Sequence, residues 1–131
     1  MFDRLEIRVL PRGPRFPAQL RFRVNGEDVV EQAVGTGGRG PLAAEALPFG
    51  LPSPLRATRE PCRVRLGEPE CTGGCCGFLS VVVQRIGDVV HWSDWQVPRV
   101  GARPSEFDFD ASEYDAEVAR AEADPWRRYS A

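Results

Sequence analysis

Four cysteines form the only cluster of reactive side chains in this sequence. They lie within fifteen residues and are the whole cysteine content of the chain: Cys62, Cys71, Cys75 and Cys76. Structural zinc sites commonly take cysteine ligands two to four residues apart, so Cys71 with Cys75 or Cys76 has about the spacing of half a site. Cys62, nine residues upstream of Cys71, would have to return to complete it. The four cysteines are therefore candidate zinc ligands, and zinc is the one cofactor that the sequence suggests.

Two other interpretations of the cysteines stay open. A strong zinc signal has two separated Cys-x-x-Cys pairs, whereas the adjacent Cys75 and Cys76 point to opposite faces if the chain is extended there. Free cysteines often serve as small buried apolar residues. A thiol-sensing role needs a cation or a helix N-terminus beside the thiol. Arg63 and Arg65 are near in sequence, but no helix is predicted to begin at the cluster.

The remaining residue types exclude several kinds of catalysis. The chain contains no lysine, which excludes Schiff-base chemistry and a phosphate-binding P-loop lysine, and His91 is its only histidine. Gln84, the expected strand partner of His91, is eight residues past Cys76. That separation is roughly 26 Å at ~3.3 Å per strand residue, too far for a Cys–His pair. We expect no catalytic residues and a protein that is not an enzyme.

Length and composition indicate one domain over residues 1–131. The N-terminus is charged and lacks the apolar region of a secretory signal, and no apolar run approaches the ~20 residues that span a bilayer. We therefore expect a cytoplasmic protein without a membrane partner. Residues 35–58 are rich in glycine and proline and read as a loop with one short helical turn from Leu42 to Leu47.

Charge is distributed unevenly along the chain. Residues 1–66 hold eleven arginines and seven acids, and residues 67–131 hold six arginines and twelve acids. A net charge of −2 with an acidic C-terminal third argues against a nucleic-acid partner. The simplest interpretation is two solvated faces of opposite sign.

Alternating apolar residues predict a first hairpin. Residues 5–9 alternate as a half-buried strand, and residues 20–24 do so up to Asn25-Gly26, the strongest short-range hairpin signal. A two-residue turn there pairs Phe22 with Val29 and sets Arg23 opposite Asp28. Residues 62–66 alternate again and predict a further strand.

A second hairpin is predicted around Gly87-Asp88, with Gln84 opposite His91. This register places five apolar residues on one buried face: Leu79, Val81, Val83, Val90 and Trp92. Trp95 falls on the other face, which makes it a candidate contact residue, although a covered tryptophan at a strand end is an equal alternative.

The C-terminal region predicts a short strand at Phe107 and Phe109, followed by a helix over residues 111–123. Asp110 with Glu113 has the pattern of a helix N-cap, and Pro125 ends the helix. The predicted fold class is α+β: an antiparallel sheet of about six strands built from two hairpins, with one C-terminal helix packed on it.

Four segments together resemble a group of short, uncharacterised proteins from high-GC actinobacteria. The resemblance covers roughly residues 60–124 and is carried by CTGGCCG at 71–77, WSDW at 92–95, FDFDA at 107–111 and YDAEV at 114–118. No function is known for that group, so the resemblance implies a source and a compartment and no activity.

These observations favour a small non-enzymatic module that binds another protein, with an immunity or antitoxin-like role as one version by analogy. Acidic residues of the last strand and helix would steer the module toward a basic partner, so Glu113, Glu117 and Trp95 are the candidate contact residues. A solvated acidic surface without a partner is the competing interpretation. A zinc-stabilised or thiol-sensing domain is the alternative function.

Overall fold

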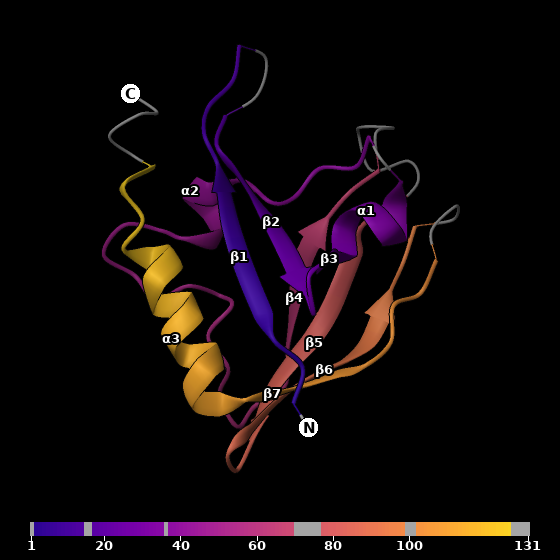
Figure 1. Ribbon diagram of the computed structural model, residues 1–131, viewed down its shortest axis with the longest axis vertical. Coiled ribbons are helices and arrows are strands. Elements are labelled where there is room, and N and C mark those ends of the chain that lie inside the picture. Colours follow the sequence, from indigo (N-terminus) through magenta and orange to yellow (C-terminus); the bar gives the residue numbers. More distant parts are fainter. Residues whose placement is uncertain (1, 15–16, 36, 70–76, 99–101, 127–131) are drawn as a thin grey trace.

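The computed structural model describes residues 2–14, 17–35, 37–69, 77–98 and 102–126. It is an α+β fold with two antiparallel sheets, one of three strands in the order β1-β2-β3 and one of four in the order β4-β5-β6-β7. The C-terminal helix α3 packs beside β1 (Figure 1). The predicted fold class is confirmed, but the single six-stranded sheet is wrong, because the two predicted hairpins belong to different sheets.

The first sheet is built around the Asn25-Gly26 turn. Its strands are β1 (Leu5–Leu10), β2 (Gln19–Val24) and the short β3 (Glu27–Asp28). Both turn residues have positive φ, 55° at Asn25 and 85° at Gly26, as a two-residue hairpin turn requires. Arg23 lies opposite Asp28, so the predicted turn and this predicted pair are confirmed.

The predicted pairing of Phe22 with Val29 is wrong, because the strand after the turn ends at Asp28. Helix α1 (Val29–Val34) begins there, with the Asp28 carboxylate accepting a hydrogen bond from the Glu31 N–H at 2.9 Å. An N-cap of this kind satisfies a backbone donor that the first helical turn leaves free. The cap outweighs the strand preference of the two valines that follow it.

The second sheet contains β4 (Cys62–Gly67), β5 (Leu79–Ile86), β6 (Val89–Gln96) and β7 (Phe107–Asp110). The β5–β6 register is the predicted one, with Gln84 opposite His91, and the five predicted apolar residues of its inner face are buried.

Trp95 does not lie on the outer face of β6, where the sequence predicted it. Its side chain is 2% exposed and lies in the core. Asp94 and Trp95 together oppose Val81, a β-bulge in which Asp94 takes a φ of 51°. The extra residue reverses the alternation and turns Trp95 to the same side as Trp92. Its predicted place on the exposed face is therefore wrong.

Helix α3 (Ala111–Glu122) follows β7 directly. The Asp110 carboxylate accepts a hydrogen bond from the Glu113 N–H at 3.1 Å, which confirms the predicted N-cap. Tyr114, Val118 and Ala121 form the buried side of the helix. The predicted helix over residues 111–123 is confirmed to within one residue.

The two sheets are connected at both edges by isolated bridges, one on one side and two on the other. Asp3 pairs with Phe109, which connects the start of β1 to β7. On the other side Arg39 pairs with Glu68 and Leu42 with Gln19, so the segment between them passes from β4 to β2. Because both ends are closed in this way, the sheets enclose one core.

Trp92 is the centre of that core. Its ring makes edge-on contacts with four aromatic rings at centroid distances of 5.1–6.3 Å: Phe22, Trp95, Phe109 and Tyr114. The Tyr114 hydroxyl donates a hydrogen bond to the Leu55 carbonyl at 2.6 Å, and burial raises the pKa of this phenol. The contact ties the 47–58 loop to α3.

Helix α2 (Ala43–Ala46) is the short turn predicted inside the glycine- and proline-rich segment. Among the described residues, no helix has both the length and the apolar character needed to cross a membrane.

Candidate functional site

A groove of about 490 Å³ lies along the outer edge of β4. We call it the β4 groove. It is lined by residues of β4, by segments 39–42 and 45–46, and by Glu68, Pro17, Gln19, Pro54, Leu55 and Phe78. This volume is within the range of ligand sites in proteins.

The groove exists because segment 39–42 separates from β4. Arg39 and Glu68 exchange two backbone hydrogen bonds of 2.9 and 2.8 Å, and two residues later the Pro41 carbonyl accepts from the Leu20 N–H of β2 at 2.9 Å. Gly40 makes this crossing possible, since a Cβ at its position would lie 1.6 Å from the Leu20 oxygen. Beyond the crossing, the two segments diverge, and no described strand pairs with β4 on the side opposite β5.

β4 is therefore an edge strand. In the described part of the chain its only strand neighbour is β5, and the bridge at Glu68 covers one position just past its end. An edge strand presents every second N–H and C=O sideways, ready to pair with another strand. On β4 those groups face the groove.

The base of the groove is apolar and firmly held. Leu55 is 1% exposed, and Ala46 and Val64 are also buried. The Ser53 hydroxyl donates a hydrogen bond to the Ala46 carbonyl at 2.5 Å and accepts one from the Leu55 N–H at 3.1 Å. These bonds fix α2 and the following loop as one wall.

Three arginines line the groove, and two of them have carboxylate partners. Arg39 pairs with Glu68 at 3.0 Å, and Arg63 reaches across the outer face of the sheet to Asp94 at 2.6 Å. The guanidinium of Arg65 lies over the Phe78 ring, 3.7 Å from its centroid. Among the described residues no carboxylate pairs with Arg65.

The cysteine cluster is described only at Cys62. This thiol is exposed at the start of β4, with Val83 as the strand partner. Cys71, Cys75 and Cys76 lie outside the described residues, and no group of three His, Cys, Asp or Glu side chains among the described residues is placed so that it could hold a metal ion. Whether zinc binds stays a prediction.

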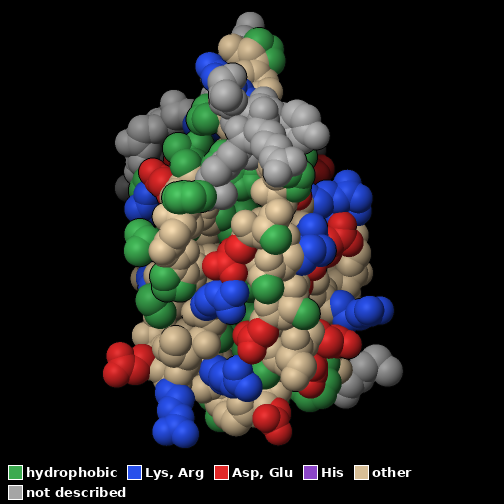
Figure 2. All heavy atoms as spheres, turned by 90° about the vertical axis from the view of Figure 1, so that its left-hand side faces the viewer, with side chains coloured by type: hydrophobic (Ala, Val, Ile, Leu, Met, Phe, Trp, Pro, Cys, Tyr) green, Lys and Arg blue, Asp and Glu red, His purple; other side chains and the backbone are tan. Residues whose placement is uncertain are grey.

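The predicted acidic surface of α3 is largely engaged within the protein. Glu122 binds the Arg56 guanidinium and accepts from the Ser53 N–H, and Asp115 pairs with Arg85 at 3.0 Å. Figure 2 shows acidic and basic side chains mixed on the face that carries α3 and β1. The predicted separation into two faces of opposite sign is therefore wrong on this side of the molecule.

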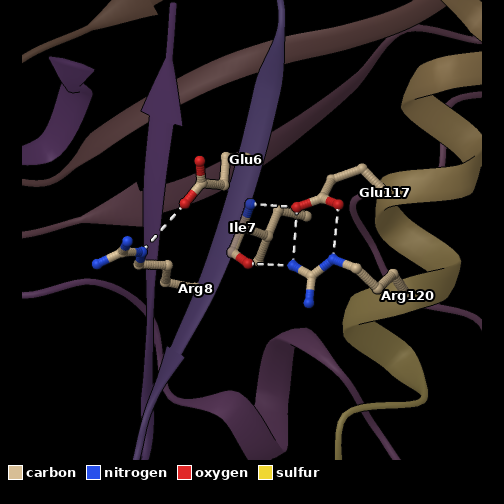
Figure 3. Close-up of polar contacts among 5 residues, drawn as sticks. All are labelled: Glu6, Ile7, Arg8, Glu117 and Arg120. Atoms are coloured by element: carbon tan, nitrogen blue, oxygen red, sulfur yellow. Dashed lines mark hydrogen bonds and ion pairs between the residues drawn. The ribbon is translucent and has the colours of Figure 1, made fainter. Parts of the chain in front are cut away.

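Glu117 has a structural role on β1. Its carboxylate accepts a hydrogen bond from the Ile7 N–H at 2.6 Å and pairs with Arg120, which donates to the Ile7 carbonyl (Figure 3). Burial opposes ionisation of Glu117, but the hydrogen bonds and charge of its partners outweigh it and lower its pKa. Glu113 is exposed, and its role as a contact residue stays a prediction.

His91 lies on the outer face of the four-stranded sheet, between two acids. Its Nδ1 is 2.5 Å from Asp108, and its Nε2 is 3.6 Å from Glu106. The sequence predicted the place of His91 on the strand but not this pairing, since β7 was not assigned a neighbour.

The β4 groove was missed by sequence reasoning, because its walls come from five separate parts of the chain. The one local signal was Gly40 between Arg39 and Pro41, which read as an ordinary loop. No protein-family model, curated protein or solved structure matches the chain.

Proposed function

We propose that the chain is a non-enzymatic module that binds another protein through the β4 groove. The observation that carries the proposal is the edge of β4, which pairs with no other strand of the described residues and lies beside an apolar base. Most natural proteins cover or shorten an exposed strand edge, because it invites pairing with other chains. Here the edge lies beside a preformed groove, which favours a role of this edge in binding.

The α3 surface supports a binding role less well. Its acids at positions 115, 117 and 122 each have an internal arginine partner, so a partner would have to compete for them. Exchanging one ion pair for another at a solvent-exposed site yields little free energy. The groove offers apolar area together with backbone groups of β4 that no strand in the described part of the chain binds.

The test uses two matched exposed glutamates on helices, Glu45 in α2, which lines the groove, and Glu113 in α3. A protein that the immobilised chain captures from lysate of the source organism is identified, purified and titrated by calorimetry. Glu45→Trp fills the groove and should weaken binding at least about tenfold, a change of ~1.4 kcal/mol. Glu113→Trp should leave the affinity within about twofold, and both variants should melt within a few degrees of the wild type.

Two results would overturn the proposal. If Glu113→Trp weakens binding and Glu45→Trp does not, the acidic surface of α3 is the interface. If no captured protein binds the purified chain with a Kd below about 100 µM, the chain is not a protein-binding module of ordinary strength.

A further inference from the structure

We propose that the occupant of the β4 groove is an extended segment of the partner, added to the sheet as a strand beside β4 and carrying a carboxylate side chain for Arg65. The inference rests on the function proposed above. It specifies the partner's conformation and its chemistry.

The edges of β1 and β4 differ in how their backbone groups are bound. On β1 the Ile7 N–H and C=O are bound by Glu117 and Arg120 of α3, which act there in place of a neighbouring strand (Figure 3). The start of β1 is bound through the Asp3 N–H, which donates to the Asp108 carbonyl at 2.8 Å. No described side chain or strand does the same for β4 between Cys62 and Gly67. An added strand would complete this edge.

The dimensions fit a short segment. β4 has six residues, which span roughly 16 Å at ~3.3 Å per residue, and the Arg39–Glu68 bridge closes one end. A bound strand of four or five residues would fill the length between that bridge and Cys62, and a longer segment would extend past Cys62, away from the bridge.

The side chains of an added strand alternate between the two faces of the sheet. On the outer face they would meet Arg65, whose guanidinium lies over Phe78 and pairs with no carboxylate of the described residues. A carboxylate can take two of those donors at once, which makes such a pair stronger and more specific than a single contact. On the inner face they would meet Ala46, Leu55 and Val64, which accept an apolar side chain. The predicted ligand therefore alternates apolar residues with Asp or Glu.

Charged side chains on an edge strand have a competing explanation. Natural proteins place charges there to prevent pairing with other chains, and Arg63 and Arg65 serve that purpose as well as they serve recognition. The two explanations differ in one respect: only recognition requires that acidic peptides bind.

The test selects linear eight-residue peptides from a random displayed library against the whole chain. The enriched sequences should carry an acid flanked at alternate positions by apolar residues. Synthetic copies should bind Arg65→Glu at least about tenfold more weakly than wild type. Arg8→Glu, at an exposed strand arginine on β1, is the matched control and should leave peptide affinity unchanged.

A second set of peptides tests the backbone. Methylating the amide nitrogen removes one donor, so methylation at alternate positions should abolish binding and methylation at the positions between should not. A peptide that tolerates methylation everywhere does not bind as a strand, and that result overturns the inference.

The remaining outcomes are equally decisive. Enrichment of no sequence, or of peptides that bind wild type and Arg65→Glu alike, overturns the inference. If, in that case, Glu45→Trp still weakens binding of the purified partner protein, the groove remains the proposed binding site. Only the inference that the partner binds as an added strand is then overturned. If neither peptide nor protein binds, both proposals fall.

Discussion

At the scale of single residues, the polar contacts of this protein serve its backbone more than its surface. Glu117, Arg120 and Glu122 looked like solvated helix charges in the sequence, yet each is bound to a backbone group or an arginine elsewhere in the fold. A helical spacing identifies which residues turn outward but not what the outward side meets. The candidate contact residues of α3 therefore could not be judged from the sequence.

Glu117 should make stability depend on acid pH. Its pKa is below the ordinary 4.5, so the unfolded chain binds more protons near that pH and the stabilisation is lost as pH falls through the folded pKa. Glu117→Gln should lower the free energy of unfolding by about 1 kcal/mol at neutral pH. It should also flatten the loss of stability that the wild type shows as pH falls below about 5. Hydrogen bonds from Arg56 and the Ser53 amide also lower the pKa of Glu122. The Glu117→Gln variant should therefore keep part of the dependence of stability on pH.

Urea unfolding followed by fluorescence at a series of pH values measures both effects. Glu113→Gln, on the exposed side of the same helix, is the control and should change stability by less than about 0.5 kcal/mol. A Glu117→Gln profile parallel to that of the wild type would show that the contact with Ile7 does not stabilise the fold.

Cys62 should not contribute to any zinc site. It stands at the opposite end of β4 from the point where the chain leaves for residues 70–76, roughly 16 Å away. If purified protein carries zinc by elemental analysis, Cys62→Ser should retain it and keep the melting temperature measured with and without chelator. Loss of the metal in this variant would place Cys62 among the ligands, as the four-cysteine hypothesis requires.

At the scale of elements, the features that the sequence predicted are those that local chemistry fixes. The Gly87-Asp88 turn sets the β5–β6 register, and Asp110 sets the start of α3. The predictions were wrong where one residue interrupts the alternation of a strand. Asp94 inserts a bulge and reverses the direction of Trp95, and the Asp28 cap starts α1 where two valines favoured a strand.

Gly40 should be the most sensitive glycine of the groove. A methyl group there would lie 1.6 Å from a backbone oxygen of β2, so Gly40→Ala must separate segment 39–42 from the sheet. We expect a loss of about 3 kcal/mol or more in the free energy of unfolding, measured by chemical denaturation. Gly13→Ala is the control, because a Cβ there meets nothing within 4 Å. Equal stabilities of the two variants would contradict the close crossing that forms the groove.

At the scale of the whole molecule, arginines of the basic half of the sequence, residues 1–66, form ion pairs with acids of the acidic half, residues 67–131. Arg39, Arg56 and Arg63 come from the arginine-rich half, and each pairs with an acid of the other half. Those pairs hold the loop and β4 in place around the groove. The groove could not be predicted from the sequence, because it depends on how two sheets join, and strand periodicity carries no information about sheet edges.

Amide hydrogen exchange of the chain with and without its purified partner tests the central claim most directly, because it reports backbone hydrogen bonds one region at a time. If the partner adds a strand in the β4 groove, the amides of β4 that point away from β5, every second one from Cys62 to Gly67, should exchange at least about tenfold more slowly in the complex, with smaller protection in α2. Exchange in α3 should change little. Protection confined to α3 and β1, with β4 exchanging as in the free protein, would contradict the account.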